Sequence, residues 1–462
     1  MKLPCPVASA AARFPERLAV EFDGQRTSWR EAAAAVSRWE RWLHDEQIGS
    51  GDRVATLSWN RPELLWLWFA LGRCGASMIP LNARLTPAEL SPLIDRSKAR
   101  FVLADASLQD RVVGARAFPS PTVPGEKEGF LDNDAELAGL FTSGTTGTPS
   151  LIPLTVQNFL ASHEANAGNL GASETQCWLG TLPLFHVGGL AMAFRCAVMG
   201  AGLVLERQFD AARVAHLLRR SDVTHASLVP TALQRVLDVN SAPFGVSLEA
   251  ILIGGGPMGA ALLTRARSLS LPVLQTYGLT EACSQVTTER RDEADGITAG
   301  RALPGLEVQI VDAEGHVVTP GVVGEIRVKG HTVTPAAGPW LSTKDLGSLD
   351  ERGRLTVHAR RVDLIVSGGE NVYPAEVEAV LRESGLVDDV AVVPAADDTW
   401  GQVPVAIVVW KGAPDEASLL AFARARLAGF KVPRRLVARA ELPRNASGKL
   451  LRHVLTGPGF LS

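Results

Sequence analysis

The sequence predicts an α/β protein with a large, multi-sheet N-terminal domain containing substantial parallel sheet and a small α+β C-terminal domain. The chain has 462 residues, which is too long for one compact core and favours at least two domains. Short β-branched runs that end at Gly or Pro alternate with Ala-, Leu- and Arg-rich helical stretches, which is typical of parallel sheet. The pattern changes near Arg360, which predicts one domain of residues 1–360 and another of residues 361–462.

The expected elements follow one another along the chain. A strand over 53–58 precedes a helix over 62–71, and a strand over 250–253 precedes a Gly-Gly-Gly-Pro turn and a further helix. Residues 114–129 are rich in Pro, Ser and charge and predict a surface loop, and residues 307–357 predict short alternating strands. The C-terminal domain should contain two helices and two strands, over 374–383, 389–393, 404–410 and 416–427.

The composition excludes several classes of protein. The 46 basic and 49 acidic residues nearly balance, and without a basic cluster a nucleic-acid partner is not expected. The five cysteines are scattered and never spaced as Cys-x-x-Cys, which argues against a disulfide framework or zinc site and favours the cytoplasm. The N-terminus lacks the layout of a secretory signal. The apolar stretch 190–205 is too short to span a membrane and predicts buried core.

The strongest single motif is Phe141-Thr-Ser-Gly-Thr-Thr-Gly-Thr-Pro, which follows an apolar run. Glycines allow a ligand to approach the backbone closely, and hydroxyl and N–H donors suit a polyphosphate. The motif therefore predicts a phosphate-binding loop, although an ordinary polar loop has the same composition. No Gly-Lys-Ser/Thr follows, so it is not a Walker A motif. The candidate residues are Thr142, Ser143, Gly144, Thr145, Thr146 and Gly147.

Further motifs follow in a fixed order. They are Leu182-Pro-Leu-Phe-His-Val-Gly-Gly, Gly254-Gly-Gly-Pro, Gln275-Thr-Tyr-Gly-Leu-Thr-Glu, Trp340-Leu-Ser-Thr-Lys-Asp-Leu-Gly, Arg360-Arg-Val-Asp-Leu-Ile-Val-Ser-Gly-Gly-Glu-Asn and Leu442-Pro-Arg-Asn-Ala-Ser-Gly-Lys. Over nearly the whole chain this series resembles the adenylate-forming superfamily of acyl-CoA synthetases, adenylation domains and luciferases. The wording around Leu184, Thr224 and Gln275 is most similar to the o-succinylbenzoate:CoA ligases of menaquinone biosynthesis.

The resemblance implies ATP, Mg²⁺ and coenzyme A as reactants and cofactors, and a small carboxylic acid as the substrate. It implies that Glu281 holds Mg²⁺, which prefers carboxylate oxygens; the alternative is a surface or capping acid. The adenine and its surroundings are assigned to Gly254, Gly255, Gly256, Tyr277, Gly278 and Thr280. Taken alone, the glycine run is ordinary turn sequence.

The same resemblance assigns roles near and beyond the predicted domain boundary. Asp345 and Arg360 match the ribose-binding pair of the family; a salt bridge near the domain junction is the alternative, and the two are compatible. Lys449 matches the catalytic lysine, which with Thr142 and Mg²⁺ stabilises charge at the α-phosphate; a lone lysine near a C-terminus is otherwise solvated. Gly368 and Gly369 are assigned to the thioester step, for which family members rotate a mobile small domain.

The acid pocket is assigned to His186, Arg195, Ser227 and Gly278. His186 lies among apolar residues and has an alternative as a core histidine. Arg195 lies in an apolar stretch, where a guanidinium needs a partner. Either it pairs internally, or it binds the second carboxylate of a dicarboxylic acid such as o-succinylbenzoate.

Several positions depart from the family pattern: Ser150 replaces a lysine of the phosphate loop, Lys344 and Ala359 replace glycines, and Val362 stands at the hinge. Three hypotheses follow. The chain is an o-succinylbenzoate:CoA ligase, a CoA ligase for another aromatic or short-chain acid with a structural Arg195, or a nucleotide-binding homologue without catalysis. Self-association is left open.

Overall fold

The computed structural model describes residues 1–126, 129–143, 149–240, 242–256, 258–359, 364–443, 450 and 452–456. Contacts between Cα atoms divide the chain into two compact units. Unit 1 comprises Met1–Ala83, Arg96–Leu140 and Leu151–Ala359, and unit 2 comprises Arg84–Asp95, Phe141–Ser150 and Arg360–Ser462. Each unit has a hydrophobic core of its own.

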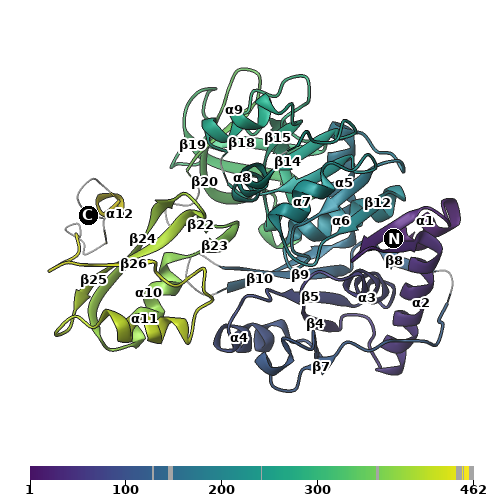
Figure 1. Ribbon diagram of the computed structural model, residues 1–462, viewed down its shortest axis with the longest axis horizontal. Coiled ribbons are helices and arrows are strands. Elements are labelled where there is room, and N and C mark those ends of the chain that lie inside the picture. Colours follow the sequence, from purple (N-terminus) through teal and green to yellow (C-terminus); the bar gives the residue numbers. More distant parts are fainter. Residues whose placement is uncertain are drawn as a thin grey trace. The chain divides into compact units, whose positions relative to one another are not determined.

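The largest sheet of unit 1 has nine strands (Figure 1). In spatial order they are β17 (Arg301–Ala302), β16 (Ser284–Thr288), β15 (Val273–Leu279), β14 (Ala250–Ile253), β13 (His225–Leu228), β11 (Cys177–Gly180), β12 (Gly202–Leu205), β2 (Leu18–Phe22) and β3 (Gln25–Ser28). The strands from β15 to β2 pair in parallel, and those beyond them are antiparallel. Every residue of β11, β12 and β14 is buried, as expected of strands covered on both faces.

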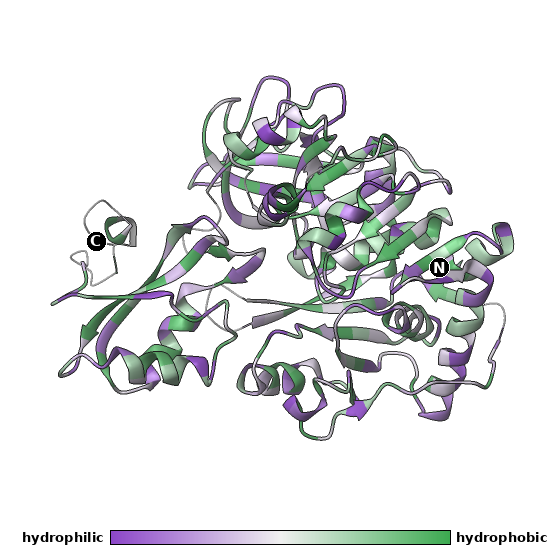
Figure 2. Ribbon diagram, in the orientation of Figure 1, coloured by the Kyte–Doolittle hydropathy of each residue, from purple (hydrophilic) through white to green (hydrophobic). Residues whose placement is uncertain are grey.

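Helices cover both faces of this sheet. Successive side chains of a strand point to opposite faces, so Trp178 joins the core beneath α5 (Val156–Leu170) and α6 (Val187–Met199). The next residue, Leu179, joins the core beneath α7 (Ala211–Leu217), α8 (Pro230–Val239) and α9 (Ala260–Ser268). Figure 2 shows these central strands mostly in the green of apolar residues. The buried stretch predicted over 190–205 is confirmed as parts of α6 and β12.

Two smaller sheets lie in the N-terminal part of the chain. One has the order β10 (Pro149–Thr155), β9 (Glu136–Ser143), β5 (Ser77–Leu81), β4 (Arg53–Leu57), β6 (Val102–Ala104) and β7 (Arg116–Ala117). The other pairs β1 (Lys2–Pro4) with β8 (Phe130–Asp132). The helices here are α1 (Pro6–Arg13), α2 (Trp29–Asp45) and α3 (Pro62–Arg73). The strand and helix predicted over 53–58 and 62–71 are thereby confirmed as β4 and α3.

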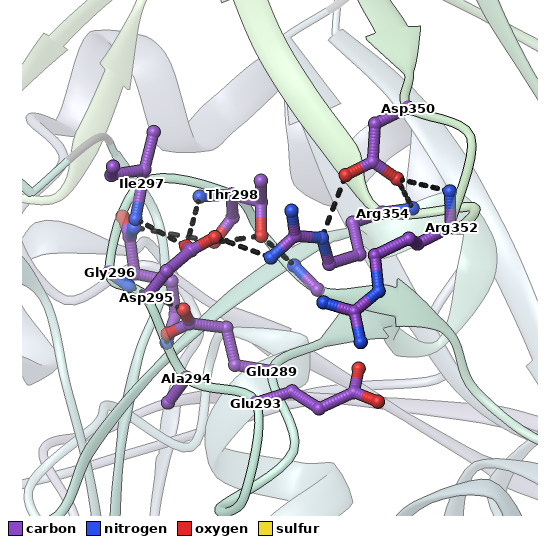
Figure 3. Close-up of polar contacts among 12 residues, drawn as sticks. Glu289, Glu293, Ala294, Asp295, Gly296, Ile297, Thr298, Asp350, Arg352 and Arg354 are labelled. Carbon is purple, nitrogen blue, oxygen red and sulfur yellow. Dashed lines mark hydrogen bonds and ion pairs between the residues drawn. The ribbon is translucent and has the colours of Figure 1, made fainter. Parts of the chain in front are cut away.

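An antiparallel sheet completes unit 1, formed by β18 (Leu306–Val311), β19 (Gly324–Gly330), β20 (Leu341–Leu349) and β21 (Leu355–Ala359). It confirms the short strands predicted over 307–357. A polar network joins this sheet to the loop after β16 (Figure 3). Arg354 donates to Asp350 in the β20–β21 turn and to Asp295 in that loop, at 2.7 Å each. The Asp295 carboxylate also accepts from the backbone N–H groups of Ile297 and Thr298.

Unit 2 is an α+β unit with the sheet β23 (Glu370–Val372), β22 (Ile365–Ser367), β25 (Gly401–Trp410) and β24 (Val387–Asp397), with β26 (Arg435–Ala438) also paired to β25. Its helices are α10 (Pro374–Glu383), α11 (Glu416–Arg424) and α12 (Arg452–Leu455), and α4 (Pro87–Ser97) lies largely in its first segment. The predicted helix over 374–383 is confirmed to the residue, and the other three predicted elements to within a few residues.

A buried ion cluster holds the segment Arg84–Asp95 within unit 2. Lys431 is 6 % exposed, and its Nζ lies 2.8 Å from Glu89 Oε1 and 2.6 Å from Glu376 Oε1. Arg84 pairs with Glu370 in the same unit. The paired charges explain why a segment near residue 90 belongs to a unit built mainly from Arg360–Ser462. Among the described residues, no helix is both long enough and apolar enough to span a bilayer.

Candidate active site

Four of the predicted site residues of unit 1 lie at one edge of the nine-stranded sheet. The parallel strands β11, β13, β14 and β15 end at this edge because parallel strands point the same way. His186 follows β11 closely, Ser227 lies near the end of β13, Gly254 directly follows β14, and Gly278 lies near the end of β15. In open α/β sheets, ligands bind beyond the carboxyl ends of the strands. The topology therefore places these four predicted residues at the edge where a ligand is expected.

Tyr277 and Asp345 are in direct contact. The Tyr277 hydroxyl donates to Asp345 Oδ2 at 2.7 Å, and both residues are buried, at 2 % and 8 % exposure. Asp345 comes from β20, so the bond joins the nine-stranded sheet to the antiparallel sheet. Two residues that were assigned to the nucleotide from separate motifs thus meet in one place.

Two of the predicted glycines, Gly278 and Gly255, occupy positions that disfavour a side chain. A Cβ on Gly278 would lie 1.9 Å from the backbone oxygen of Ser284, which no relaxation of side chains could relieve. Gly255 has φ +82°, a left-handed conformation that favours glycine. Gly255 is exposed and Gly254 and Gly256 are half-buried, so a flat ring could lie against the backbone of this run.

Glu281 lies in a single 3₁₀ turn, Thr280–Ala282, directly after β15. The turn is fixed by its backbone: Thr334 N–H donates to the Glu281 carbonyl at 2.8 Å, and Cys283 N–H donates to the Thr280 carbonyl. Cys283 and Ser284 both have positive φ, a strained conformation of the kind that collects at functional sites. Within the described part of the chain, the Glu281 carboxylate has no hydrogen-bond or ion-pair partner. It is therefore free to take a hard cation, and a single carboxylate suffices when phosphates supply other Mg²⁺ ligands.

His186 is the N-cap residue of α6 and is half-buried. Its ring packs edge-on against Phe185, with ring centroids 4.9 Å apart. The segment before it is anchored by Asn60, whose Oδ1 accepts from Leu184 N–H and whose amide donates to the Leu182 carbonyl. His186 thus lies at the start of the helix that also carries Arg195.

Arg195 lies inside the core at 3 % exposure, nine residues along α6 from His186 and so about 13 Å deeper along the helix axis. Its guanidinium lies 4.7 Å above the Trp178 ring, and Nη2 donates to Gln285 Oε1 at 3.1 Å. Its Nε is buried without a hydrogen-bond partner, and no carboxylate of the described chain pairs with it. Burial lowers the Arg195 pKa to about 10, so the group is still charged at neutral pH.

Two histidines flank this cation. His225 stacks on the Trp178 ring, which also contacts the Arg195 guanidinium; the centroids of the two rings are 4.7 Å apart. Burial and then the charges of Arg291 and Arg195 lower the His225 pKa to about 3. Burial and Arg195 lower the His163 pKa to about 4, and His163 Nδ1 is buried without a partner. Both rings are neutral at pH 7. Neither histidine therefore adds a second positive charge beside Arg195.

The sequence did not identify the neighbours of Arg195: Trp178, His225, His163 and Gln285. They come from β11, β13, α5 and β16, and only the parallel pairing of β11 with β13 brings Trp178 opposite His225. A usable signal was present for His225, because a polar residue is uncommon inside a fully buried parallel strand.

The remaining predicted residues lie in unit 2 or outside the described chain. Thr142 and the backbone of Ser143 end β9, and Ser150 is an exposed residue of β10. Gly368 and Gly369 form the two-residue turn between β22 and β23, both with positive φ. The predicted residues outside the described part are Gly144, Thr145, Thr146, Gly147, Arg360 and Lys449, and the hinge residue Val362 is outside it too.

Comparison with known proteins agrees with this arrangement. The AMP-binding enzyme family matches residues 7–336, and the AMP-binding enzyme C-terminal domain matches residues 376–449. The chain belongs to the AMP-binding enzyme family. The resemblance and the fold class expected from the sequence are thereby confirmed.

Individual members of the AMP-binding enzyme family narrow the comparison. The chain is 41 % identical to the 2-succinylbenzoate–CoA ligase of Geobacillus kaustophilus, covering 96 % of this chain and 95 % of that protein. The enzyme of the same name from Bacillus subtilis is 36 % identical. The o-succinylbenzoate CoA synthetase of Bacillus subtilis, bound to a product analogue, superposes with a TM-score of 0.93 at 34 % identity, covering 99 % of both chains.

Proposed function

We propose that the protein is an ATP-dependent o-succinylbenzoate:CoA ligase that acts through an acyl-adenylate in menaquinone biosynthesis. It would convert o-succinylbenzoate, ATP and CoA to o-succinylbenzoyl-CoA, AMP and pyrophosphate, in the cytoplasm. The single observation that carries the choice of acid is Arg195, a buried cation without a carboxylate partner in the described chain. The similarity to 2-succinylbenzoate–CoA ligases over 96 % of the chain supports the same choice.

Residues 1–360 would bind ATP and the acid. In this proposal Tyr277 and the Gly254–Gly256 turn border the adenine, and Asp345 accepts hydrogen bonds from the ribose hydroxyls together with Arg360. The bond between Tyr277 and Asp345 supports a shared surface for base and sugar. The loop from Thr142 to Gly147 would hold the phosphates, with Thr142 placed near the reacting α-phosphate.

Glu281 would hold Mg²⁺, which neutralises charge on the phosphate oxygens. In the first half-reaction a carboxylate oxygen of the acid bonds to the α-phosphorus, and the bond from this phosphorus to pyrophosphate breaks. Two anions approach each other in this step, so a nearby cation stabilises the transition state. Lys449, carried by residues 361–462, is proposed to supply that charge.

In the second half-reaction the CoA thiolate would attack the acyl carbonyl carbon, and the bond to AMP would break. The Gly368–Gly369 turn is proposed to border the path of the thiol. The turn carries no side chain of its own, and a Cβ on Gly368 would lie 2.6 Å from the Trp400 ring. Close approach of a narrow pantetheine chain needs such a surface.

Arg195 would bind the carboxylate of the acid that does not react. Arg195 lies nine residues along α6 from His186, which is about 13 Å of helix axis, so the acid would run from the strand ends near His186 and Ser227 toward the Arg195 guanidinium. A carboxylate there would satisfy the unpartnered Nε and replace the water that burial has removed. A fatty acid offers no group for this position.

The test compares three acids in one assay of acyl-CoA and AMP formation with ATP, Mg²⁺ and CoA. They are o-succinylbenzoate, 4-oxo-4-phenylbutanoate, which lacks the ring carboxylate, and 2-butanoylbenzoate, which lacks the aliphatic one. Wild type should prefer o-succinylbenzoate, and Arg195→Leu should lose that preference by roughly 10- to 100-fold, as expected for a charge-assisted hydrogen bond of about 1.5–3 kcal/mol.

Lys449→Ala serves as the chemical control, because it should abolish acid-dependent exchange of pyrophosphate into ATP without changing the preference among bound acids. The proposal fails if wild type turns over another acid but not o-succinylbenzoate. The role of Arg195 fails if Arg195→Leu keeps the wild-type preference.

A further inference from the structure

We propose that Gln285 is a positioning residue that sets the preference for a dicarboxylic acid, because it holds Arg195 in place without neutralising it. The inference rests on the proposed function and adds a residue that neither the motifs nor the resemblance assigned. Gln285 lies on β16, four residues beyond Glu281, and is 6 % exposed.

The Gln285 amide is held on both sides. Its Oε1 accepts from Arg195 Nη2 at 3.1 Å and from Asn166 Nδ2 at 2.9 Å, and its Nε2 donates to Thr288 Oγ1 at 3.0 Å. Turning the amide over would set its NH₂ against two donors, so the network fixes which end faces the cation. The oxygen of Gln285 therefore points at Arg195, and α5, α6 and β16 together define the position of the guanidinium.

An arginine that binds an anion can be held in place by a neutral hydrogen-bond acceptor without losing its charge. A buried arginine is normally paired with a carboxylate, which would cancel the charge and leave little attraction for a ligand. Gln285 instead accepts a single hydrogen bond from Arg195 and carries no charge, and the Trp178 ring supports the guanidinium face at 4.7 Å. Nε stays unpartnered, and the neutral rings of His163 and His225 add no charge. The described residues around Arg195 therefore leave its positive charge without a neutralising partner, and an anionic ligand would balance that charge.

A purely structural role is the competing explanation. Gln285 could simply link α5, α6 and β16, in which case any residue that keeps the hydrogen bonds would serve. Gln285→Glu separates the two roles. It keeps the size of the side chain and its ability to accept from Arg195 and Asn166, but it places a negative charge 3.1 Å from the guanidinium.

The experiment measures kcat and KM of the full chain for o-succinylbenzoate and for 4-oxo-4-phenylbutanoate. In Gln285→Glu, KM for o-succinylbenzoate should rise roughly 10- to 100-fold with little change in kcat, because the internal ion pair competes with the ring carboxylate. The kcat/KM for 4-oxo-4-phenylbutanoate should be unchanged or higher. Thermal unfolding and turnover of the monoacid report that the variant is folded.

Two further variants keep the test decisive. Gln285→Met, which leaves Arg195 charged but removes its hydrogen bond to residue 285, should raise KM for o-succinylbenzoate without helping the monoacid. Gln176→Glu is the matched control, since Gln176 is another buried glutamine of unit 1, at 6 % exposure, whose Oε1 accepts from Trp178 Nε1 instead of Arg195. It should keep the wild-type ratio between the two acids.

The outcomes distinguish this inference from the proposed function. If wild type prefers o-succinylbenzoate and Gln285→Glu keeps that preference, Gln285 is structural and the inference is overturned alone. If wild type does not use o-succinylbenzoate, the proposed function falls and the inference falls with it. Collapse of the preference in Gln285→Glu but not in Gln176→Glu supports both.

Discussion

Lys344 shows how one departure from the family pattern is accommodated. Its φ is +64°, in the left-handed region that favours glycine, and the family commonly has glycine at this position. Its N–H donates to Glu325 Oε1 at 3.1 Å, and its Nζ lies 3.6 Å from the same oxygen. With the side chain 60 % exposed, this ion pair contributes little. The lysine therefore carries a conformational cost next to Asp345.

Replacing Lys344 by glycine should stabilise the protein. The left-handed conformation costs a residue with a Cβ about 1–2 kcal/mol, and glycine loses about 0.5–1 kcal/mol of that gain through the entropy of the unfolded chain. We expect the free energy of unfolding to rise by about 0.5–1 kcal/mol in urea titrations. Lys344→Ala is the control, because it removes the ion pair but keeps the Cβ. Equal effects of the two changes would show that the ion pair, and not the backbone, decides.

At the level of single residues, the sequence predicted candidate site residues that belong to contiguous motifs. It did not predict contacts between residues that only the folded chain brings together. Tyr277 and Asp345 were both proposed from motifs, and the structure brings them into contact. Arg195 was singled out because a charge in an apolar stretch is costly. Its support by Gln285 was not foreseen, because the two lie 90 positions apart and an isolated glutamine in a strand carries no signal.

At the scale of elements, the start of α6 determines where the proposed acid pocket would begin. Gly189 in its first turn lies against the preceding loop, and a Cβ there would be 2.3 Å from the Pro183 carbonyl oxygen. A Cβ on the neighbouring Gly188 would meet only the end of the Leu182 side chain, at 3.0 Å. The two glycines thus differ in what a methyl group would strike, although they are adjacent in one helix.

Gly189→Ala should therefore shift the start of α6, lower the free energy of unfolding by about 1–3 kcal/mol and weaken acid binding. Gly188→Ala should be neutral or gain up to about 1 kcal/mol, because alanine favours helix more than glycine does. Urea unfolding and KM for the acid measure both effects. Matching results for the two variants would mean that the contact with Pro183 does not constrain the helix.

Local sequence patterns predicted the helices and strands themselves better than they predicted which of them lie side by side. The helices α3 and α10 and the strands β4 and β14 carry strong helical or β-branched patterns between Gly or Pro residues, and their limits were anticipated to within a few residues. The order of strands in the nine-stranded sheet depends on crossovers between distant segments, such as β2 beside β12, and no local pattern encodes them.

At the scale of the whole molecule, the two compact units are not two continuous stretches of the chain. Unit 2 consists mainly of Arg360–Ser462 but also takes in Arg84–Asp95 and Phe141–Ser150. Composition reveals a change of pattern near Arg360, yet it cannot reveal that Lys431 pairs with Glu89. Such pairs form between segments more than 300 positions apart, and their charges look like ordinary surface residues in the sequence.

The stability of the whole protein should fall in mild acid because of its buried histidines. The pKa of His225 is lowered to about 3 and that of His163 to about 4, by burial first and then by nearby arginines. Histidine in the unfolded chain titrates near pH 6.5. Below that pH the unfolded chain therefore binds protons that these histidines do not bind in the folded protein. The contribution is complete above pH 6.5 and is lost as the pH falls toward 4.

For His225 alone, a gap of this size corresponds to on the order of 3 kcal/mol between pH 6.5 and 4. Carboxylates also titrate in this range, so the informative quantity is the difference between variants. Urea midpoints measured from pH 7.5 to 4.5 should fall less steeply for His225→Phe, which keeps the stacking on Trp178 but cannot be protonated. His44→Asn, at an exposed position, should follow the wild-type curve. If His225→Phe loses stability in parallel with wild type, the neutral histidine beside Arg195 is not what makes the fold sensitive to acid.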